Sequence, residues 1–279
     1  MDTIEAIAAA AEDADGAAPL DEATFLALRN HPDSVRSWVR DDGFALLIGD
    51  ELSLVVRPDA RGHGLGRSLL EEALTDASDG LSAWSHGDHP AAARLAETHG
   101  FARVRELWVM RRPSSVPLPT LGVPDDLTVR GYEPGDAADI VRVNAAAFAH
   151  HPEQGAMDAV NLAERMAEPW FDPAGLLVAT DGDRLLGFHW TKQHSPELGE
   201  VYVVGIDPAA QGRGLGKLLT LAGLHHLTDL GVHEILLYVA SDNEPAIAVY
   251  SGLGFRHDAA DTHVMYQRSN MGPPSVTSG

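Results

Sequence analysis

Residues 205–220 read GIDPAAQGRGLGKLLT, and residues 55–70 read VVRPDARGHGLGRSLL. Both stretches contain a proline, two further residues, an arginine or glutamine, and then Gly-x-Gly-Leu-Gly followed by a basic residue. Each follows an apolar run typical of a strand and precedes leucines at helical spacing. A glycine-rich turn at such a junction presents backbone N–H groups at a helix N-terminus, where they and the helix dipole suit a phosphate. The sequence therefore predicts a phosphate-binding loop in each half of the chain.

The similarity between the two halves extends beyond these loops. The segment HPAAARLAETHGF at 89–101 aligns with NEPAIAVYSGLGF at 243–255. Between the halves, a proline-rich stretch without helical or strand periodicity is typical of a linker. The sequence thus predicts an α/β protein built from two copies of one mixed α/β unit. The expected parts are a first domain over 1–112, a linker over 113–126, a second domain over 127–270 and a disordered tail over 271–279.

Local patterns predict several elements of the second half. A helix is expected to begin at Asp136, and a hairpin over 175–193 is expected to turn at the sequence DGD. After the second loop, apolar residues on one face predict a helix that stops at Gly231.

Composition excludes some classes of function. Lys and Arg total 20 against 41 Asp and Glu, which gives a formal net charge of −21. Such a charge argues against nucleic acid or an anionic membrane as a partner, so a polyanionic ligand would need a local binding arrangement. The chain has no cysteine, which fits the cytosol, and it has no apolar run long enough to span a bilayer. No secretory signal pattern is present at the N-terminus, so we expect a cytoplasmic protein.

Both loops resemble the pyrophosphate loop of the GCN5-related N-acetyltransferase (GNAT) family, which has the pattern Arg/Gln-x-x-Gly-x-Gly after a strand. A second GNAT block, an asparagine at a strand end followed by a helix with a tyrosine and then Gly-Phe, is also present. It comprises Asn243, Ala246, Tyr250, Gly254 and Phe255. The glycine spacing differs from that of a dinucleotide-binding fingerprint, and no Gly-Lys-Ser/Thr of a Walker loop follows.

The second half is more specifically similar to the mycothiol synthase family, whose members carry two GNAT domains in tandem. The resemblance rests on AAFAHHPEQG, GFHWTK, GEVYVVGIDPAAQGRGLGKLLT and LLYVASDN, and in the first half, more loosely, on PLDEATFLAL and the loop. It implies two tandem acyl-CoA N-acyltransferase domains, each a central mixed twisted sheet flanked by helices. It also implies transfer of acetyl from acetyl-CoA to the cysteinyl amine of desacetylmycothiol, giving mycothiol.

The resemblance implies that acetyl-CoA lies across each loop, with its pyrophosphate on the loop N–H groups and its pantetheine arm along the preceding strand. In the second half the implied cofactor-binding residues are Val204, Gly205, Ile206, Gln211, Gly212, Arg213, Gly214, Leu215, Gly216, Lys217, Asn243, Glu244, Pro245, Ala246, Ile247 and Ala248. In the first half they are Leu54, Val55, Val56, Arg61, Gly62, His63, Gly64, Leu65 and Gly66. No metal is expected, because the histidine clusters at 86–89, 150–151 and 225–226 lack a third ligand on one helical face.

The reaction needs a neutral amine as nucleophile and a proton for the departing thiolate. A free α-amine has a pKa of about 7.7–8.0, so a modest base suffices. Glu200 matches the acidic residue of the family at this strand and is the implied base, acting directly or through a water; Tyr250 matches the general acid. The residues implied to contact the acceptor are Glu22, Glu153, Lys192, Glu200 and Tyr238.

The first copy lacks part of this machinery. Alignment of the two copies places Asp50 opposite Glu200, Ala96 opposite Tyr250 and His89 opposite Asn243. Alanine cannot donate a proton, so we expect the first domain to bind acetyl-CoA without catalysing, although Asp50 keeps a carboxylate there.

Two other functions remain open at this point. One is a tandem acetyltransferase for another amine, such as an aminoglycoside or a peptide N-terminus. The other is a non-catalytic CoA-binding regulator, against which the presence of Tyr250 and Glu200 speaks. We expect small-molecule substrates and a monomer.

Overall fold

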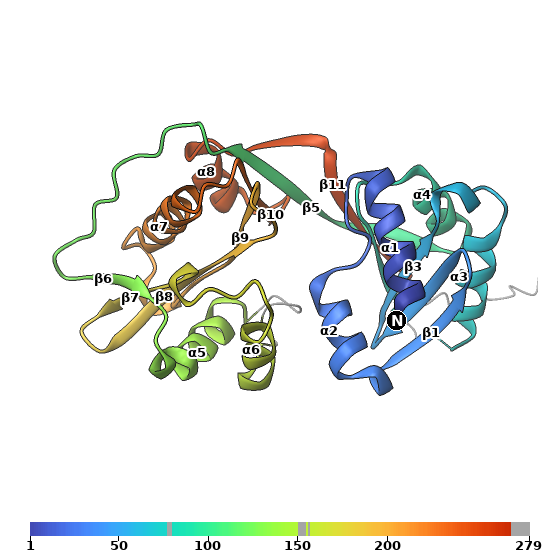
Figure 1. Cartoon of the computed structure of the whole chain (residues 1–279), viewed down its shortest axis with the longest axis horizontal. Helices are drawn as coiled ribbons and strands as arrows, with labels where there is room; N and C mark the ends of the chain where they lie inside the picture. The colour runs from blue at the N-terminus through green and yellow to red at the C-terminus, as the bar shows by residue number, and fades with distance from the viewer. Residues whose placement is uncertain (77–79, 150–154, 156, 269–279) are drawn as a thin grey trace, which may run out of the picture. The chain divides into compact units, whose positions relative to one another are not determined.

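The computed structural model describes residues 1–76, 80–149, 155 and 157–268, and it divides into two compact units (Figure 1). Unit 1 combines Met1–Trp108 with the segment that begins at Asp258, and unit 2 spans Val109–His257. These limits differ from the expected 1–112 and 127–270, because the long strands β5 (Phe101–Pro113) and β11 (Arg256–Arg268) each run from one unit into the other. The tail expected over 271–279 lies outside the described residues.

Unit 1 is a sheet with helices on its two faces. Its strands follow the order β1-β2-β3-β4-β11, and β11 pairs antiparallel with β4. A strand that follows the second GNAT block therefore completes the sheet of the first unit. The strands that begin here are β1 (Val35–Arg40), β2 (Gly43–Ile48), β3 (Glu51–Val56) and β4 (Ser82–Ser85). The helices are α1 (Asp2–Asp15), α2 (Glu22–Asn30), α3 (Leu65–Asp76) and α4 (Pro90–Thr98).

Alternation along β2 explains how unit 1 buries both faces of its sheet. Phe44 and Leu46 lie in one core with the apolar stripe of α1, whereas Ala45 and Leu47 lie in another core with α3 and α4. Successive side chains of a strand point to opposite faces, so a continuous apolar run suits a strand covered on both sides.

Unit 2 repeats this architecture with one more strand. Its order is β5-β10-β9-β8-β7-β6, in which β9 and β10 run parallel and β6, β7, β8 and β9 pair antiparallel in succession. The remaining strands are β6 (Thr128–Gly131), β7 (Leu176–Asp181), β8 (Arg184–Gln193), β9 (Leu198–Ile206) and β10 (Glu234–Ala240). The helices are α5 (Ala137–Ala147), α6 (Ala159–Met166), α7 (Leu215–Asp229) and α8 (Glu244–Gly252).

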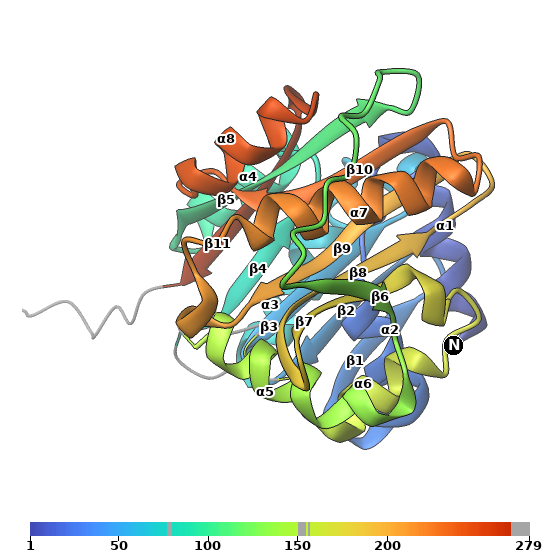
Figure 2. The ribbon, with the colours of Figure 1, turned by 90° about the vertical axis from the view of Figure 1, so that its left-hand side faces the viewer.

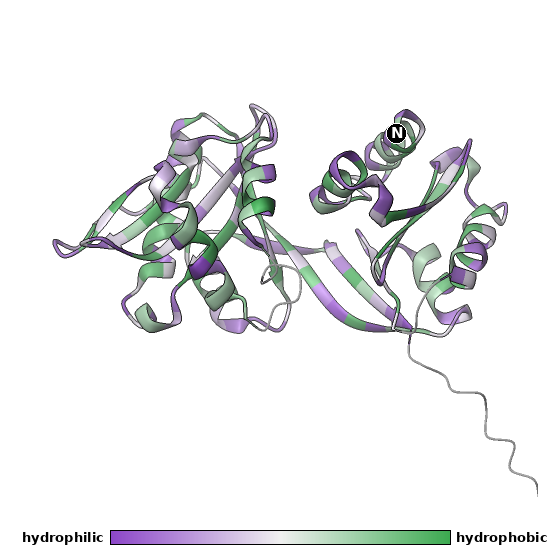
Figure 3. Ribbon diagram, turned by 90° about the horizontal axis from the view of Figure 1, so that it is seen from below, coloured by the Kyte–Doolittle hydropathy of each residue, from purple (hydrophilic) through white to green (hydrophobic). Residues whose placement is uncertain are grey.

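Helices cover the two faces of the unit 2 sheet. Helix α7 lies along β8 and β9 on one face (Figure 2) and buries Leu215 and Leu219 there. Helices α5 and α6 pack on the other face, against a core that contains Phe188 and Trp190 of β8. Hydrophobic and hydrophilic stretches alternate along the helix ribbons in Figure 3, as expected for amphipathic helices that cover a sheet. None of the described helices is long and apolar enough to cross a membrane.

The expected elements of the second half are confirmed. Asp136 is the N-cap of α5, the hairpin β7–β8 turns at Gly182 and Asp183, and α7 ends just before Gly231, whose φ is +85°. The sequence reading missed β1 and α6. Both elements bury little, since every residue of β1 is at least partly exposed and α6 fully buries only Leu162.

Candidate active site

The two glycine-rich loops have nearly the same backbone. In the second loop Gly212 has a φ of +81° and Gly214 a φ of +75°; in the first loop Gly62 and Gly64 have +82° and +91°. These values lie in the left-handed region that side chains disfavour. The glycine spacing is therefore set by the backbone path of the loop, and both copies follow that path.

The second loop leads directly into the N-terminus of α7. Gly214 is the N-cap, and its carbonyl accepts the N–H of Leu218 at 3.0 Å, so the amides of the intervening first turn have no acceptor within the helix. No atom lies within 4 Å of the position that a Cβ would take at Gly212, Gly214 or Gly216. Free amides, an open approach and the positive end of a helix are the requirements of a phosphate site.

The strands β9 and β10 pair along only part of their length. Their ladder runs from Leu198–Glu234 to Val201–Leu237, whereas β9 continues to Ile206. On its other edge β9 still pairs with β8 as far as Ile206. Within the part of the chain that the structure describes, the edge of β9 over 202–206 that faces β10 thus has no strand partner. Its backbone groups can pair with an extended ligand.

Unit 1 has an equivalent strand edge without a partner among the described residues. The ladder between β3 and β4 consists of Glu51–Ser82 and Leu52–Ala83, whereas β3 continues to Val56. The residues expected to line a pantetheine arm, 54–56 and 204–206, thus lie at equivalent unpaired strand edges in the two units.

Gly205 leaves space for the ring of Phe188 on the neighbouring strand. A Cβ at Gly205 would lie 2.6 Å from a ring carbon of Phe188, which is fully buried on β8. Any side chain here would displace the core of unit 2 beneath the strand edge. The identity of this glycine is therefore explained by packing.

Helix α8 carries most of the second GNAT block that the sequence analysis identified. Asn243 is its N-cap, and the side-chain carbonyl accepts the N–H of Ala246 at 3.2 Å. Tyr250 packs edge-on against Phe255 with ring centroids 6.0 Å apart, and burial raises the pKa of its phenol. No hydrogen-bond partner for the phenol is found among the described residues. A neutral phenol without a competing acceptor can donate its proton to a substrate atom.

Three of the residues implied to contact the acceptor share one face of the sheet. Lys192 on β8 is the register partner of Glu200 on β9, which is in turn the register partner of Leu236 on β10. Tyr238 lies two residues beyond Leu236 and so on the same face, where it is 43% exposed. Glu22 is the first residue of α2 in unit 1, and Glu153 lies outside the described residues.

Glu200 has a partner that the sequence reading missed. Its carboxylate is almost fully buried, and its Oε2 accepts a hydrogen bond of 2.6 Å from Nε2 of His194. His194 directly follows β8, two residues after Lys192. Pairing of the β8–β9 hairpin was the signal for this contact, because it brings the end of β8 beside the start of β9.

Aromatic side chains that the sequence reading also missed surround Lys192. Its ammonium lies 4.6 Å from the ring centroid of Trp170 and 5.3 Å from that of Tyr202. Both rings belong to the aromatic cluster that packs on Trp190. Cation–π contacts of this kind fix a flexible lysine in place.

The first loop differs from the second in its charged contacts. Arg61 is held by two hydrogen bonds of 2.7 Å to Asp15 of α1, and His89 lies 3.2 Å from the same carboxylate. The hydrogen bonds from Arg61, followed by the charge of His89, hold the pKa of Asp15 below its usual range. Ala96, opposite Tyr250 in the alignment, is buried in the core of unit 1.

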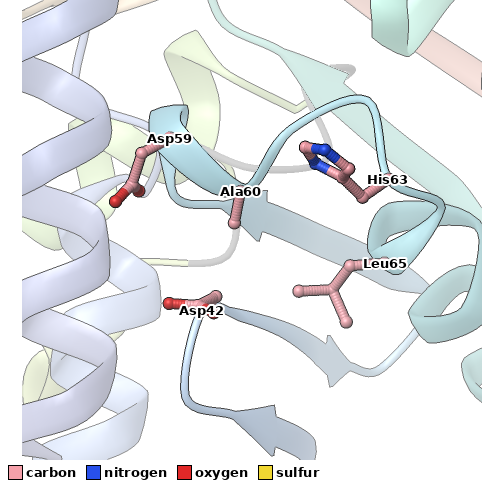
Figure 4. A pocket seen from close by; sticks show the side chains of 5 residues that line it. All are labelled: Asp42, Asp59, Ala60, His63 and Leu65. Carbon is pink, nitrogen blue, oxygen red and sulfur yellow. The ribbon is translucent and has the colours of Figure 1, made fainter.

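A shallow depression of about 370 Å³ lies beside the first loop (Figure 4). The carboxylates of Asp42 and Asp59 line it together with His63. Arg57 pairs with both carboxylates, at 3.7 and 3.2 Å. The acidic side chains would repel an anionic ligand that lay in this depression. A ligand bound to the backbone amides of the loop would not face them in the same way.

The histidine clusters do not form a metal centre where the structure describes them. Over residues 1–76, 80–149, 155 and 157–268, no group of three or more His, Asp or Glu side chains is arranged as metal ligands. The histidines at 150–151 lie outside these ranges.

Comparison with known proteins supports the GNAT assignment of both units. The Acetyltransferase (GNAT) family model matches residues 145–255, and an Acetyltransferase (GNAT) domain model matches residues 21–103. A tandem GNAT protein from the clavulanic acid biosynthesis pathway superposes with a TM-score of 0.66 at 21% identity, over 90% of this chain and 87% of that chain. A GNAT from Sphaerobacter thermophilus gives a TM-score of 0.65 at 21% identity, over 95% and 91%. The expected fold of two tandem GNAT domains is thereby confirmed.

Curated relatives match nearly the whole chain. A mycothiol acetyltransferase from Nocardioides sp. is 67% identical over 94% of this chain and 95% of its own length. A mycothiol acetyltransferase from Nocardia farcinica is 48% identical over 91% and 90%, respectively. The resemblance found in the sequence motifs therefore extends through both units.

Proposed function

The chain belongs to the mycothiol acetyltransferase family of tandem GNAT enzymes, and we propose that it transfers acetyl from acetyl-CoA to the cysteinyl amine of desacetylmycothiol. As a member of this family it is an acyltransferase. The substrate pair, the site and the roles of its residues are argued below from the geometry of unit 2.

The observation that carries this function is the partial ladder between β9 and β10 beside the glycine-rich loop. The loop amides at 211–217 suit the pyrophosphate of acetyl-CoA, and the unpaired edge at 204–206 suits the amide groups of its pantetheine arm. Residues 243–248 begin helix α8, which follows the end of β10 that lies beyond its paired part. This arrangement would deliver the thioester between the Glu200 face of the sheet and Tyr250.

Acetyl transfer requires that the acceptor nitrogen loses two protons and that the departing thiolate gains one. Glu200 takes a proton from the acceptor ammonium, which frees the nitrogen lone pair to attack the thioester carbon. A carbon–nitrogen bond forms, the carbon–sulfur bond breaks, and Tyr250 donates its phenolic proton to the departing thiolate. The second proton, which the new amide nitrogen must lose, returns to the Tyr250 phenolate. Burial keeps this phenol protonated, as a general acid requires. Lys192 and Tyr238 offer donors to the hydroxyl groups of a sugar, and Glu22 and Glu153 belong to the same proposed acceptor set.

Catalysis is assigned to unit 2 alone. Unit 1 has the loop and the unpaired strand edge that acetyl-CoA would use, including Arg61 and its neighbours. It has Ala96 in place of Tyr250. The first site can thus hold acetyl-CoA but offers no proton donor at the position of Tyr250.

The test is an acetyl-CoA turnover assay over a panel of amines that contains desacetylmycothiol, an aminoglycoside and a peptide with a free N-terminus. We expect desacetylmycothiol to be acetylated with the highest kcat/KM. Preference for another amine would be consistent with the acetyltransferase assignment but would refute desacetylmycothiol as the acceptor. Acetyl-CoA binding without any turnover would favour a regulatory CoA-binding protein.

A further inference from the structure

His194 is the one described residue whose side chain bonds the Glu200 carboxylate. Glu200 is 5% exposed, and its Oε2 lies 2.6 Å from Nε2 of His194, whose side chain is 35% exposed. A carboxylate this deeply buried has few groups to orient it. The direction in which its free oxygen points thus depends strongly on this single contact.

The hairpin fixes His194 as well as Glu200. The backbone N–H of His194 donates to the carbonyl of Leu198 at 2.9 Å, and the last register pair of the hairpin is Gln193–Gly199. Both partners of the contact therefore lie close to the turn of one hydrogen-bonded hairpin. A group held on rigid elements loses little entropy when it orients a neighbour.

Other charges near Glu200 are engaged elsewhere. Lys192 pairs in register with Glu200, but its ammonium lies over the rings of Trp170 and Tyr202. On the opposite side, the register partner on β10 is the apolar Leu236. Glu197, on the same turn as His194, accepts a hydrogen bond from Ser195. These neighbours leave the orientation of the carboxylate to His194.

We infer that His194 is a positioning residue for the reaction: it donates N–H to Oε2 of Glu200 and so directs Oε1 toward the acceptor amine. The inference rests on the proposed role of Glu200 as base. The imidazole touches no reacting atom. Its removal should lower kcat through misplacement of the base, while binding of acetyl-CoA at the distant loop stays unchanged.

The test is a double-mutant cycle with a conservative variant. We expect His194→Ala to lower kcat roughly tenfold or more, as loss of a well-placed proton acceptor does, with an unchanged KM for acetyl-CoA. His194→Gln retains a side-chain N–H and should recover most of the loss. In a Glu200→Gln background, His194→Ala should have little further effect, because both changes act on one group. His233→Ala, at an exposed histidine near the start of β10, is the matched control.

Several outcomes would overturn the inference. These are an unchanged kcat in His194→Ala, an equal loss in His194→Gln, or losses that multiply in the double variant. Calorimetric binding of acetyl-CoA to each variant with the wild-type stoichiometry establishes that unit 2 is folded. The cycle is run on whichever amine the wild type acetylates best. Failure of desacetylmycothiol as acceptor would thus remove the proposed substrate and leave the test of His194 intact.

Discussion

Protonation of a buried histidine should destabilise unit 2 in mild acid. His189 of β8 is fully buried, its Nδ1 lies 2.8 Å from the carbonyl oxygen of Leu219, and its Nε2 has no partner among the described residues. Burial, with a smaller contribution from nearby His226, lowers the pKa of His189 to about 4. The unfolded chain, with a histidine pKa of about 6.5, then binds a proton at a higher pH than the native state does.

The size of the effect follows from this difference in pKa. Stability conferred by neutral His189 is fully present above the unfolded pKa and is lost as pH falls toward about 4. Linkage gives a loss of about 2 kcal/mol between roughly pH 7.5 and pH 5, and about 3 kcal/mol in total. Because the imidazole is fully buried, solvent does not screen this effect.

Urea unfolding of the full chain measures this loss at several pH values. His189→Gln keeps a donor for the carbonyl of Leu219 but does not titrate. Between the same pH values, the variant should therefore lose about 2 kcal/mol less stability than the wild type loses. The comparison uses slopes against pH, since the variant also changes packing beside Gly223, where an added Cβ would collide with the ring. His233→Gln, at an exposed site, should keep the wild-type slope. A pH-independent difference between wild type and His189→Gln would refute the reasoning.

Three further predictions concern the site itself. Gly214→Val should abolish acetyl-CoA binding to unit 2 in calorimetry, because the side chain enters the open approach to the loop amides; Gly231→Val, with similar backbone strain at the other end of α7, should not. Glu200→Gln should lower turnover more at about pH 7 than at about pH 9, where a free amine is mostly neutral, and a pH-independent defect would make Glu200 a binding residue only. Tyr250→Phe should lower kcat by roughly 10²-fold or more, whereas Gly64→Val in the first loop should leave it within a few-fold. Loss of kcat in a folded Gly64→Val protein would contradict the assignment of catalysis to unit 2.

Many features of the fold and of the loops could be predicted from the sequence, because they depend on local interactions. The positive φ values of the loop glycines, the cap at Asp136 and the turn at Gly182 depend on neighbours within a few residues. The duplication was visible for the same reason, since each copy repeats the same local solutions in the same order. Strand β1 and helix α6 were not predicted, because neither has enough buried positions to produce a clear hydrophobic periodicity in the sequence.

Tertiary structure alone decided how these pieces meet. The end of the β9–β10 ladder depends on two strands that are distant in sequence. The pairing of β11 with β4 of the first unit also joins strands that are distant in sequence. The contact of His194 with Glu200 required the register of the β8–β9 hairpin, and the burial of His189 required the close approach of α7. Local sequence sets backbone conformation at each residue, whereas pairing and burial are set by the free energy of contacts between segments that only the folded chain brings together.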